Sequence, residues 1–214
     1  MSEQQFVHLH NHSDYSLLDG AMKTRAMVAK AAACGQPALA LTDHGNMFGS
    51  VEFYLACRAA EIKPILRMEA YVTRDHTDRS ADKRNRSYHM VLLARNETGY
   101  RNLAKLSSMG YLEGFYYRPR IDRDILAQHS EGLIGLSACM SGEPNFHLRT
   151  RNVKAALLGI EDAFTEIGHR VPIVVLPVVS CVRAADTIGP TTVSPTPGAR
   201  CAKSWGPLAP RCGA

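Results

Sequence analysis

The feature that most constrains this fold is an alternation of short apolar runs with helix-period segments over about the first 140 residues. The apolar runs predict buried strands at 6–10, 38–42, 63–72, 88–94 and 131–139, and helical periodicity predicts helices at 23–34, 50–60 and 98–109. Because strands and helices alternate at this spacing, the sequence predicts an α/β fold built from right-handed βαβ units around a parallel sheet or barrel.

Composition changes towards the end of the chain. The 214 residues include 11 prolines, and seven of these lie in 171–214 together with the single Trp. This stretch shows neither helical nor strand periodicity, which is typical of a disordered tail. We therefore expect one domain in 1–143, a helical segment in 144–170 with its helix at 154–167, and an atypical Pro-rich irregular tail in 171–214.

The chain carries no obvious targeting signal. Its first residues lack a basic stretch followed by an apolar one, so a secretory signal peptide is not expected. The sequence has no apolar run near the ~20 residues that span a bilayer. Its net charge of +5 is modest and does not by itself indicate a nucleic-acid binder. We expect a cytoplasmic protein with no membrane partner.

The first candidate functional residues are a pair of histidines. His8 and His10 are two residues apart on a predicted strand, so both imidazoles point to the same face. Imidazole suits Zn, Mn and Fe, and the pair could hold a metal. The alternative is two half-exposed strand histidines without a function. His12 has the same parity but follows the predicted strand, and it is not included in the candidate site.

Further imidazoles and carboxylates occur at or near the ends of successive predicted strands. His44 and Glu69 follow or end the second and third strands, His89 lies on the fourth, and Asp19 lies in the first loop. Singly, each has a structural explanation: Asp19 begins an Asp-Gly turn, and His89 suits a hydrogen-bonded core position. Jointly they predict a metal-binding rim, because α/β folds place their chemistry at strand ends.

Several longer motifs resemble one known family. They are His8-x-His10, SLLDG, LALTDHGNMFGSVEFY, IKP followed by Glu69, YHMVLLARNETGYRNLAKL, YLEGFYYRPRID and SEGLIGLSACMSGE. Together they resemble the PHP (polymerase and histidinol phosphatase) domain that begins the alpha subunits of bacterial DNA polymerase III. The resemblance covers about residues 5–143. LTDHGN alone suggests only the PHP superfamily, whereas YLEGFYYRPRID and SEGLIGLSAC are similar to the polymerase branch.

The resemblance implies a distorted (β/α)7 barrel, here incomplete, with up to three divalent metals (Zn, Mn or Fe) that hydrolyse phosphoesters. Carried over by position, the implied metal ligands are His8, His10, Asp19, His44, Glu69, His89 and Cys139. A thiolate at Cys139 would suit zinc. The alternative for Cys139 is a small apolar residue buried in the core.

This sequence departs from the family pattern at three places. Arg67 stands two residues before Glu69, where the family usually has Gly, and we expect its side chain to crowd or screen the cluster. The family's final Asp-x-His motif has no match in 144–214, so fewer than three metals are expected. Beyond about residue 143 the resemblance ends, which predicts a truncated or frame-disrupted chain. The resemblance places the family's paired polymerase aspartates in a palm domain, and we expect no polymerase active site in this chain.

Three functions follow as expectations. The first is a PHP fragment of a replicative DNA-directed DNA polymerase, acting in DNA replication with DNA and the rest of the polymerase III holoenzyme as partners. Its own activity would be a metal-dependent 3′-5′ exonuclease or phosphoesterase. The second is a stand-alone small-molecule phosphatase of the PHP superfamily. The third is a non-catalytic binding module with a structural metal.

Overall fold

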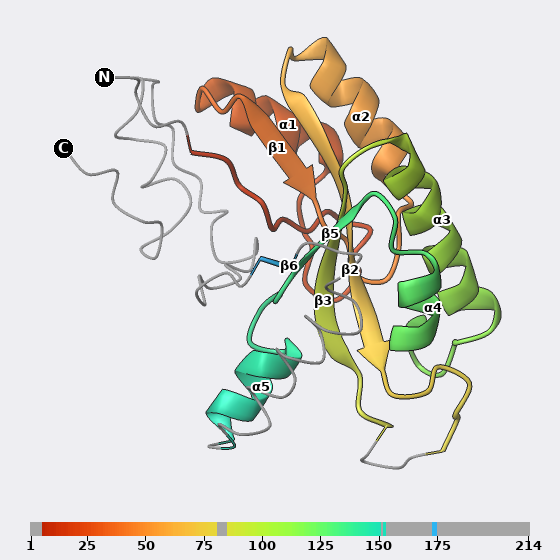
Figure 1. The fold of residues 1–214 in the computed structure, drawn as a ribbon. Helices are drawn as coiled ribbons and strands as arrows, with labels where there is room; N and C mark the ends of the chain where they lie inside the picture. The colour runs from red at the N-terminus through yellow and green to blue at the C-terminus, as the bar shows by residue number, and fades with distance from the viewer. Residues whose placement is uncertain (1–5, 81–84, 151, 153–172, 175–214) are drawn as a thin grey trace. The chain divides into compact units, whose positions relative to one another are not determined.

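The computed structural model describes residues 6–80, 85–150, 152 and 173–174 (Figure 1). The chain divides into two compact units. Among the described residues, unit 1 comprises 6–43 and 48–66, and unit 2 comprises 44–47 and the residues from 67 onward. The strand β2 (Lys63–Thr73) contributes its first four residues to unit 1 and the others to unit 2. Each unit is described by itself.

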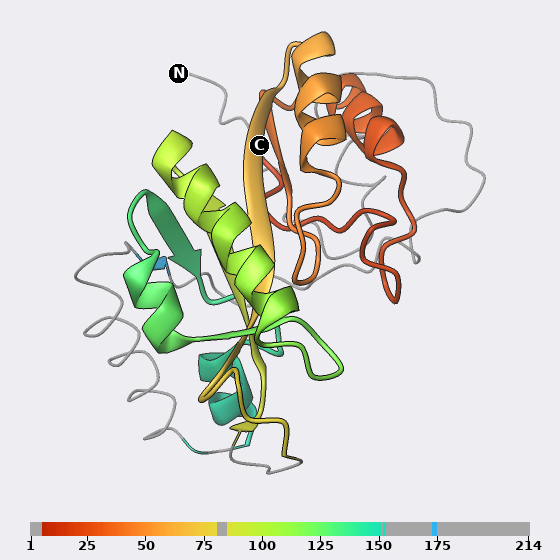
Figure 2. The same ribbon diagram turned by 90° about the vertical axis from the view of Figure 1, so that its right-hand side faces the viewer.

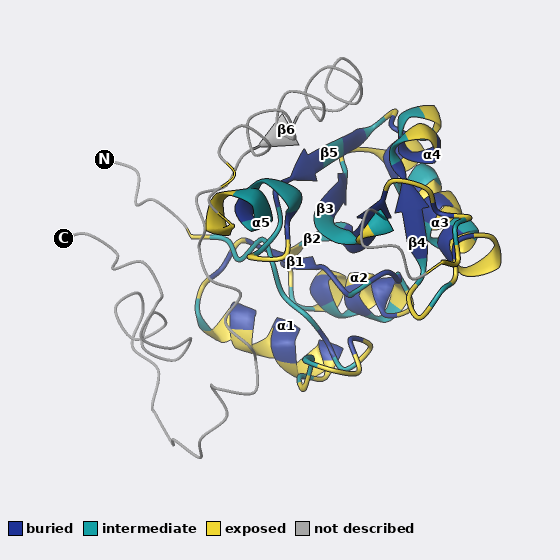
Figure 3. Cartoon of the chain, turned by 90° about the horizontal axis from the view of Figure 1, so that it is seen from below, coloured by how far each residue is buried: buried dark blue, intermediate teal, exposed yellow. Residues whose placement is uncertain are grey.

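Unit 1 packs two helices against a short parallel strand pair. Helices α1 (Thr24–Ala33) and α2 (Ser50–Ala59) both contact β1 (Ala38–Leu41), which pairs in parallel with the start of β2. The buried residues of α1 recur at helical spacing and form one apolar face. Figure 3 shows this face as the buried side of an otherwise exposed helix. The predicted helices at 23–34 and 50–60 and the strand at 38–42 are confirmed.

The predicted strand at 6–10 is wrong as a regular strand, although its backbone follows β1. The amide of Ala40 donates to the carbonyl of His8, and the amide of Thr42 donates to the carbonyl of Asn11. The other hydrogen bonds of this segment involve side chains: the His8 amide donates to Gln36 Oε1, and the Asn11 side-chain amide donates to the Ala40 carbonyl. These side chains replace backbone partners, so the ladder is interrupted.

Unit 2 is built on the second part of β2. This part pairs antiparallel with β3 (Tyr88–Ala94) and parallel with β4 (Arg120–Asp122). Strand β5 (Leu133–Leu136) pairs antiparallel with β3, and β6 (Ile173–Val174) pairs parallel with β5. Helices α3 (Glu97–Leu112), α4 (Arg123–Gln128) and α5 (Glu143–Arg149) complete the unit, with α3 packed on β3, β4 and β5 (Figure 2).

The strand directions in unit 2 correct the expectation of a parallel sheet. The predicted strands at 63–72, 88–94 and 131–139 and the helix at 98–109 all exist, but β3 runs antiparallel to both β2 and β5. The segment between β2 and β3 is polar throughout and has no apolar face to lay on a sheet. The chain therefore reverses through a loop, where a parallel return would need a crossover, usually a helix. The result is a mixed α/β architecture.

Each unit has its own hydrophobic core. The core of unit 1 joins α1, α2 and β1 around Met27, Leu39 and Phe53, none of which is exposed. The core of unit 2 joins Leu92 of β3 to Leu103 and Leu106 of α3, again with no exposed surface. Figure 3 shows β4 and β5 as mainly buried and the outer helix faces as exposed.

Part of the sequence-based prediction falls on residues that the structure does not describe. The helix predicted at 154–167 and nearly all of the tail at 171–214 lie outside the described residues, which include only Ile173 and Val174 from that end. Within the described residues, no helix has the length and apolar character needed to cross a membrane.

Candidate metal centre

A buried glutamate of unit 2 lies between two imidazoles. Glu69, on β2, has no exposed surface. Its Oε2 is 3.1 Å from Nδ1 of His44, and its Oε1 is 3.0 Å from Nδ1 of His89. Ligand atoms of all three side chains lie within 4.8 Å of one another. Three of the predicted metal ligands are therefore brought together around one carboxylate.

The backbone around His44 explains how this imidazole reaches Glu69. His44 and Glu69 form an isolated parallel bridge, and the amide of Gly45 donates to the Glu69 carbonyl at 2.8 Å. Gly45 has a φ of 64°, and a Cβ there would lie 2.5 Å from Cγ of Pro119. Only glycine accepts both conditions cheaply, so the glycine of the TDHGN motif fixes the turn that presents His44.

The thiol of Cys139 joins the centre from the loop after β5. Its Sγ lies 3.6 Å from Nδ1 of His89 and accepts the amide of Ser141 at 3.4 Å. The amide of His89 donates to the carbonyl of Ser141, which ties this loop to β3. Cys139 lies outside any disulfide and has intermediate exposure, so the alternative of a small apolar residue buried in the core is not what the structure shows.

The aromatic ring of Tyr71 borders both imidazoles. Its ring centroid is 5.8 Å from that of His44 in a stacked arrangement and 5.1 Å from that of His89 in an edge arrangement. The guanidinium of Arg118 lies over the Tyr71 ring, 5.0 Å from its centroid. Arg118 is thus held against the ring that borders the two imidazoles, through a cation–π contact.

The surroundings of His89 favour its protonated form when no metal is bound. Burial disfavours the imidazolium, but hydrogen bonds and charge interactions with Cys139 and Glu69 outweigh burial and raise the pKa of His89 to about 9. A cation is therefore favoured at this position. A bound metal would have to displace that proton.

The remaining predicted ligands, His8, His10 and Asp19, belong to unit 1. Ligand atoms of His12 lie within 4.8 Å of those of His10 and of Asp19. His8 is not part of these pairs; its ring meets the Phe6 ring edge-on at 4.6 Å, and burial lowers the pKa of His8 to about 4. His12 was omitted by the sequence reasoning, although its shared parity with His8 and His10 was a signal that could have included it.

Arg67 of unit 2 is 1% exposed, and burial lowers its pKa to about 9. The residue at this position, where the family usually has Gly, is therefore a buried guanidinium two residues before Glu69.

Asp43 of unit 1 is a second buried carboxylate, and its partners are hydroxyls and an amide. It accepts hydrogen bonds from the amide and the hydroxyl of Ser13, both at 2.7 Å, and from the hydroxyl of Ser16 at 2.8 Å.

The donor set of unit 2 fits a divalent metal. Two imidazole nitrogens and a carboxylate are ligands that Zn, Mn and Fe accept, and an adjacent thiol favours zinc among them. Glu69 is fully buried, and a buried carboxylate needs a compensating positive charge. The residues to hold such an ion would be His44, Glu69 and His89, with Cys139 at hydrogen-bond distance from His89.

The chain is similar to several curated proteins. It is 49% identical over 178 residues to the DNA polymerase III subunit alpha of Treponema pallidum, which covers 78% of this chain and 15% of that protein. It is 55% identical over 140 residues to that of Borreliella burgdorferi, covering 64% of this chain and 12% of the relative. It is 47% identical to that of Helicobacter pylori, covering 74% and 13%. The chain thus spans only a small part of these relatives.

Among solved structures, an amidohydrolase from Chromobacterium violaceum aligns at 24% identity with a TM-score of 0.34 over 57% of this chain and 48% of that chain. A TM-score this low carries no argument about function. The family comparison is decisive by contrast, because the PHP domain model matches residues 8–171, which include every ligand candidate named above. The chain belongs to the PHP domain family.

Proposed function

We propose that this chain is the PHP region of a bacterial DNA polymerase III alpha subunit and that its unit 2 centre is a metal-dependent phosphoesterase site acting on DNA 3′ ends. The observation that carries the proposal is the buried Glu69, whose two carboxylate oxygens lie 3.1 and 3.0 Å from the imidazoles of His44 and His89. The identities of 47–55% to polymerase alpha subunits support the polymerase branch over a stand-alone phosphatase.

The chain's own residues would prepare the site for an anionic phosphoester. Glu69 orients both imidazoles through its two oxygens, so the rings are held before any ligand arrives. Arg118, whose guanidinium lies over the ring of Tyr71, would attract and align a phosphate. When bound, a divalent metal supplies Lewis-acid stabilisation for the charge that develops on the phosphoester.

The protonation state of His89 determines the pH at which the centre can bind a metal. With its pKa raised to about 9, His89 keeps both ring protons at neutral pH in the metal-free protein, with Nδ1 near Glu69 and Cys139. The proton must leave when His89 becomes a metal ligand. We therefore propose that the centre loads more readily as pH rises from 7 towards 9.

The wider proposals follow from the relatives and not from this site. We propose the (β/α)7 barrel of the family for the complete domain, DNA and the other polymerase subunits as partners, and a role in DNA replication. His8, His10 and Asp19 of unit 1 are proposed as further ligands by their match to the family's motifs.

The test is cleavage of 3′-labelled single-stranded DNA by the full chain with Mn²⁺ or Zn²⁺. Glu69→Gln should abolish cleavage, because it removes the charge that holds both imidazoles. Glu131→Gln, an exposed glutamate of the same unit, is the matched control and should retain the activity. Equal cleavage by wild type and Glu69→Gln would refute the proposal. Preferential turnover of p-nitrophenyl phosphate would instead favour the small-molecule phosphatase.

A further inference from the structure

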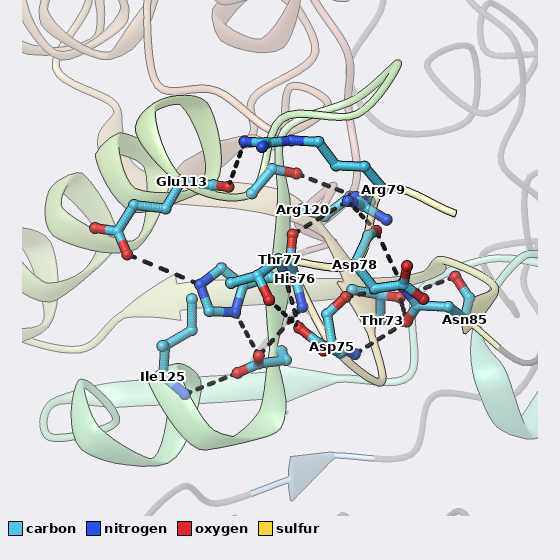
Figure 4. A network of polar contacts seen from close by, with 12 residues as sticks. Thr73, Asp75, His76, Thr77, Asp78, Arg79, Asn85, Glu113, Arg120 and Ile125 are labelled. Atoms are coloured by element: carbon cyan, nitrogen blue, oxygen red, sulfur yellow. Dashed lines mark hydrogen bonds and ion pairs between the residues drawn. The ribbon is translucent and has the colours of Figure 1, made fainter. Parts of the chain in front are cut away.

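A second polar cluster of unit 2 contains none of the predicted metal ligands. It joins the loop that follows β2 to the first residue beyond α3 and to the residue that caps α4 (Figure 4). Its central residue is His76, which is 9% exposed. The residues that flank its imidazole are Asp122, on one ring nitrogen, and Glu113, facing the other.

Asp122 fixes the orientation of the His76 ring. Its Oδ1 accepts the amide of Ile125, and its Oδ2 accepts the amide of His76 and pairs with Nδ1 of the same residue. Since Asp122 already accepts two main-chain N–H groups, it acts as a carboxylate, and Nδ1 is the proton donor in its pair with His76. With its one proton at Nδ1, such a ring presents a lone pair at Nε2. A carboxylate that fixes the tautomer of a histidine in this way is characteristic of metal-ligating histidines.

The other nitrogen of this ring is buried without a hydrogen bond. Nε2 of His76 has no hydrogen-bond partner among the residues that the structure describes. The nearest charged group is Oε2 of Glu113, at 3.9 Å. A lone pair facing a carboxylate at this distance is repulsive unless a cation lies between them. Figure 4 shows the two side chains directed toward each other.

The neighbouring arginines do not supply that cation. The guanidinium of Arg79 donates to the main-chain carbonyl of Glu113 at 3.4 Å. That of Arg120 donates to the main-chain carbonyls of His76, Asp78 and Gly114. Both arginines thus bond carbonyls and brace the loop, while the Nε2 of His76 and the Glu113 carboxylate face each other.

We propose that His76 Nε2 and the Glu113 carboxylate bind a divalent cation of the zinc class, with Asp122 as the positioning residue behind His76 and water completing the coordination. Bonds of 2.0–2.2 Å at a tetrahedral angle separate nitrogen and oxygen by about 3.4 Å, so a closure of about half an ångström suffices. The Glu113 side chain is 56% exposed and can make this adjustment freely.

This site shares no residue with the His44–Glu69–His89 centre. Its ligands connect the loop after β2 to the end of α3, which are distant in sequence. A metal that joins two such segments contributes its binding free energy to the folded state. The bound metal would therefore fix this loop to the end of α3. Loss of this metal should leave phosphoester chemistry at the first centre intact.

The test is Zn²⁺ and Co²⁺ binding to the full chain in a His44→Ala, His89→Ala background, which removes the first centre. Calorimetry and the visible spectrum of Co²⁺ measure metal binding at the remaining site. Thermal melting measures how much the bound metal stabilises the folded chain. Glu113→Gln should weaken binding at least tenfold and abolish the rise in Tm on adding Zn²⁺. Glu97→Gln, at the other end of α3 where it pairs with exposed Arg101, is the matched control and should change neither.

Two results would overturn the proposal. One is a Zn²⁺ affinity in Glu113→Gln equal to that of the background protein. The other is an NMR spectrum in which both ring nitrogens of His76 remain protonated in excess Zn²⁺, which would make a proton the bridging cation. Because Glu113 is exposed, its variant should fold even if His76→Gln does not. Failure of this site would leave the proposed phosphoesterase untouched, since the first centre is tested separately.

Discussion

Two buried carboxylates, Asp43 of unit 1 and Glu69 of unit 2, have opposite surroundings. Asp43 accepts hydrogen bonds from the amide and hydroxyl of Ser13 and from the hydroxyl of Ser16. Glu69 is contacted by two imidazoles, groups that can exchange a proton for a metal. Burial alone therefore does not identify a functional carboxylate; the chemistry of its donors separates a structural role from a metal-binding one.

The largest expected effect comes from removing the carboxylate of unit 2. Glu69→Ala should weaken Zn²⁺ or Mn²⁺ binding at the first centre by more than about a hundredfold, because even outer-shell partners of a metal are worth ten- to a hundredfold. Calorimetry on the full chain with Glu113→Gln in the background measures this site alone. An affinity within threefold of the unmutated chain would show that Glu69 is not a ligand.

The matching change in unit 1 should act on stability instead. Asp43→Ala leaves the Ser13 amide and two buried hydroxyls without their acceptor, and the free energy of unfolding should fall by about 2 kcal/mol. Urea denaturation measures this loss. The metal affinity of the folded variant should stay within threefold of wild type. A hundredfold loss would place Asp43 in the metal site, and the two carboxylates would then share a role.

Cys139→Ser tests whether the thiol gives the unit 2 centre a preference for zinc over manganese. A thiolate prefers zinc over manganese, so this variant should bind Zn²⁺ about tenfold more weakly and Mn²⁺ almost unchanged. Competition with a chromophoric chelator compares the two ions directly. Cys57→Ala, which removes the buried thiol of α2, is the control and should alter neither affinity. Equal losses for both ions would indicate that Cys139 supports the loop and not the metal.

The smallest effect concerns pH. Burial raises the pKa of the Cys57 thiol from 9.0 to about 11, so the unfolded chain ionises this group first as pH rises. The thiol therefore costs no stability below pH 9, and between pH 9 and 11 the folded state should lose about 1 kcal/mol relative to Cys57→Ala. Melting both proteins across this range tests the difference. Parallel curves would show that Cys57 ionises freely in the folded state.

Local sequence pattern predicted much of the secondary structure. The helices near 24–33 and 50–59 and the strands near 38–41 and 88–94 follow apolar spacing that the residues carry themselves. Strand β4 and helices α4 and α5 were not predicted, because three to seven residues are too few to show a period. The direction of β3 also escaped prediction, since it depends on how a polar loop returns the chain.

The candidate ligands were available from residue type and position in the chain, and so was the family. Which of them meet was decided by tertiary structure: His44 and Glu69 are 25 positions apart, and His89 and Cys139 are 50 apart. The pairing of His76 with Asp122 was not predicted, because His76 lies outside the quoted motifs and Asp122, although it ends YLEGFYYRPRID, had no predicted partner. A strand or helix depends on neighbours along the chain, whereas a binding site depends on distances across it, which only packing sets.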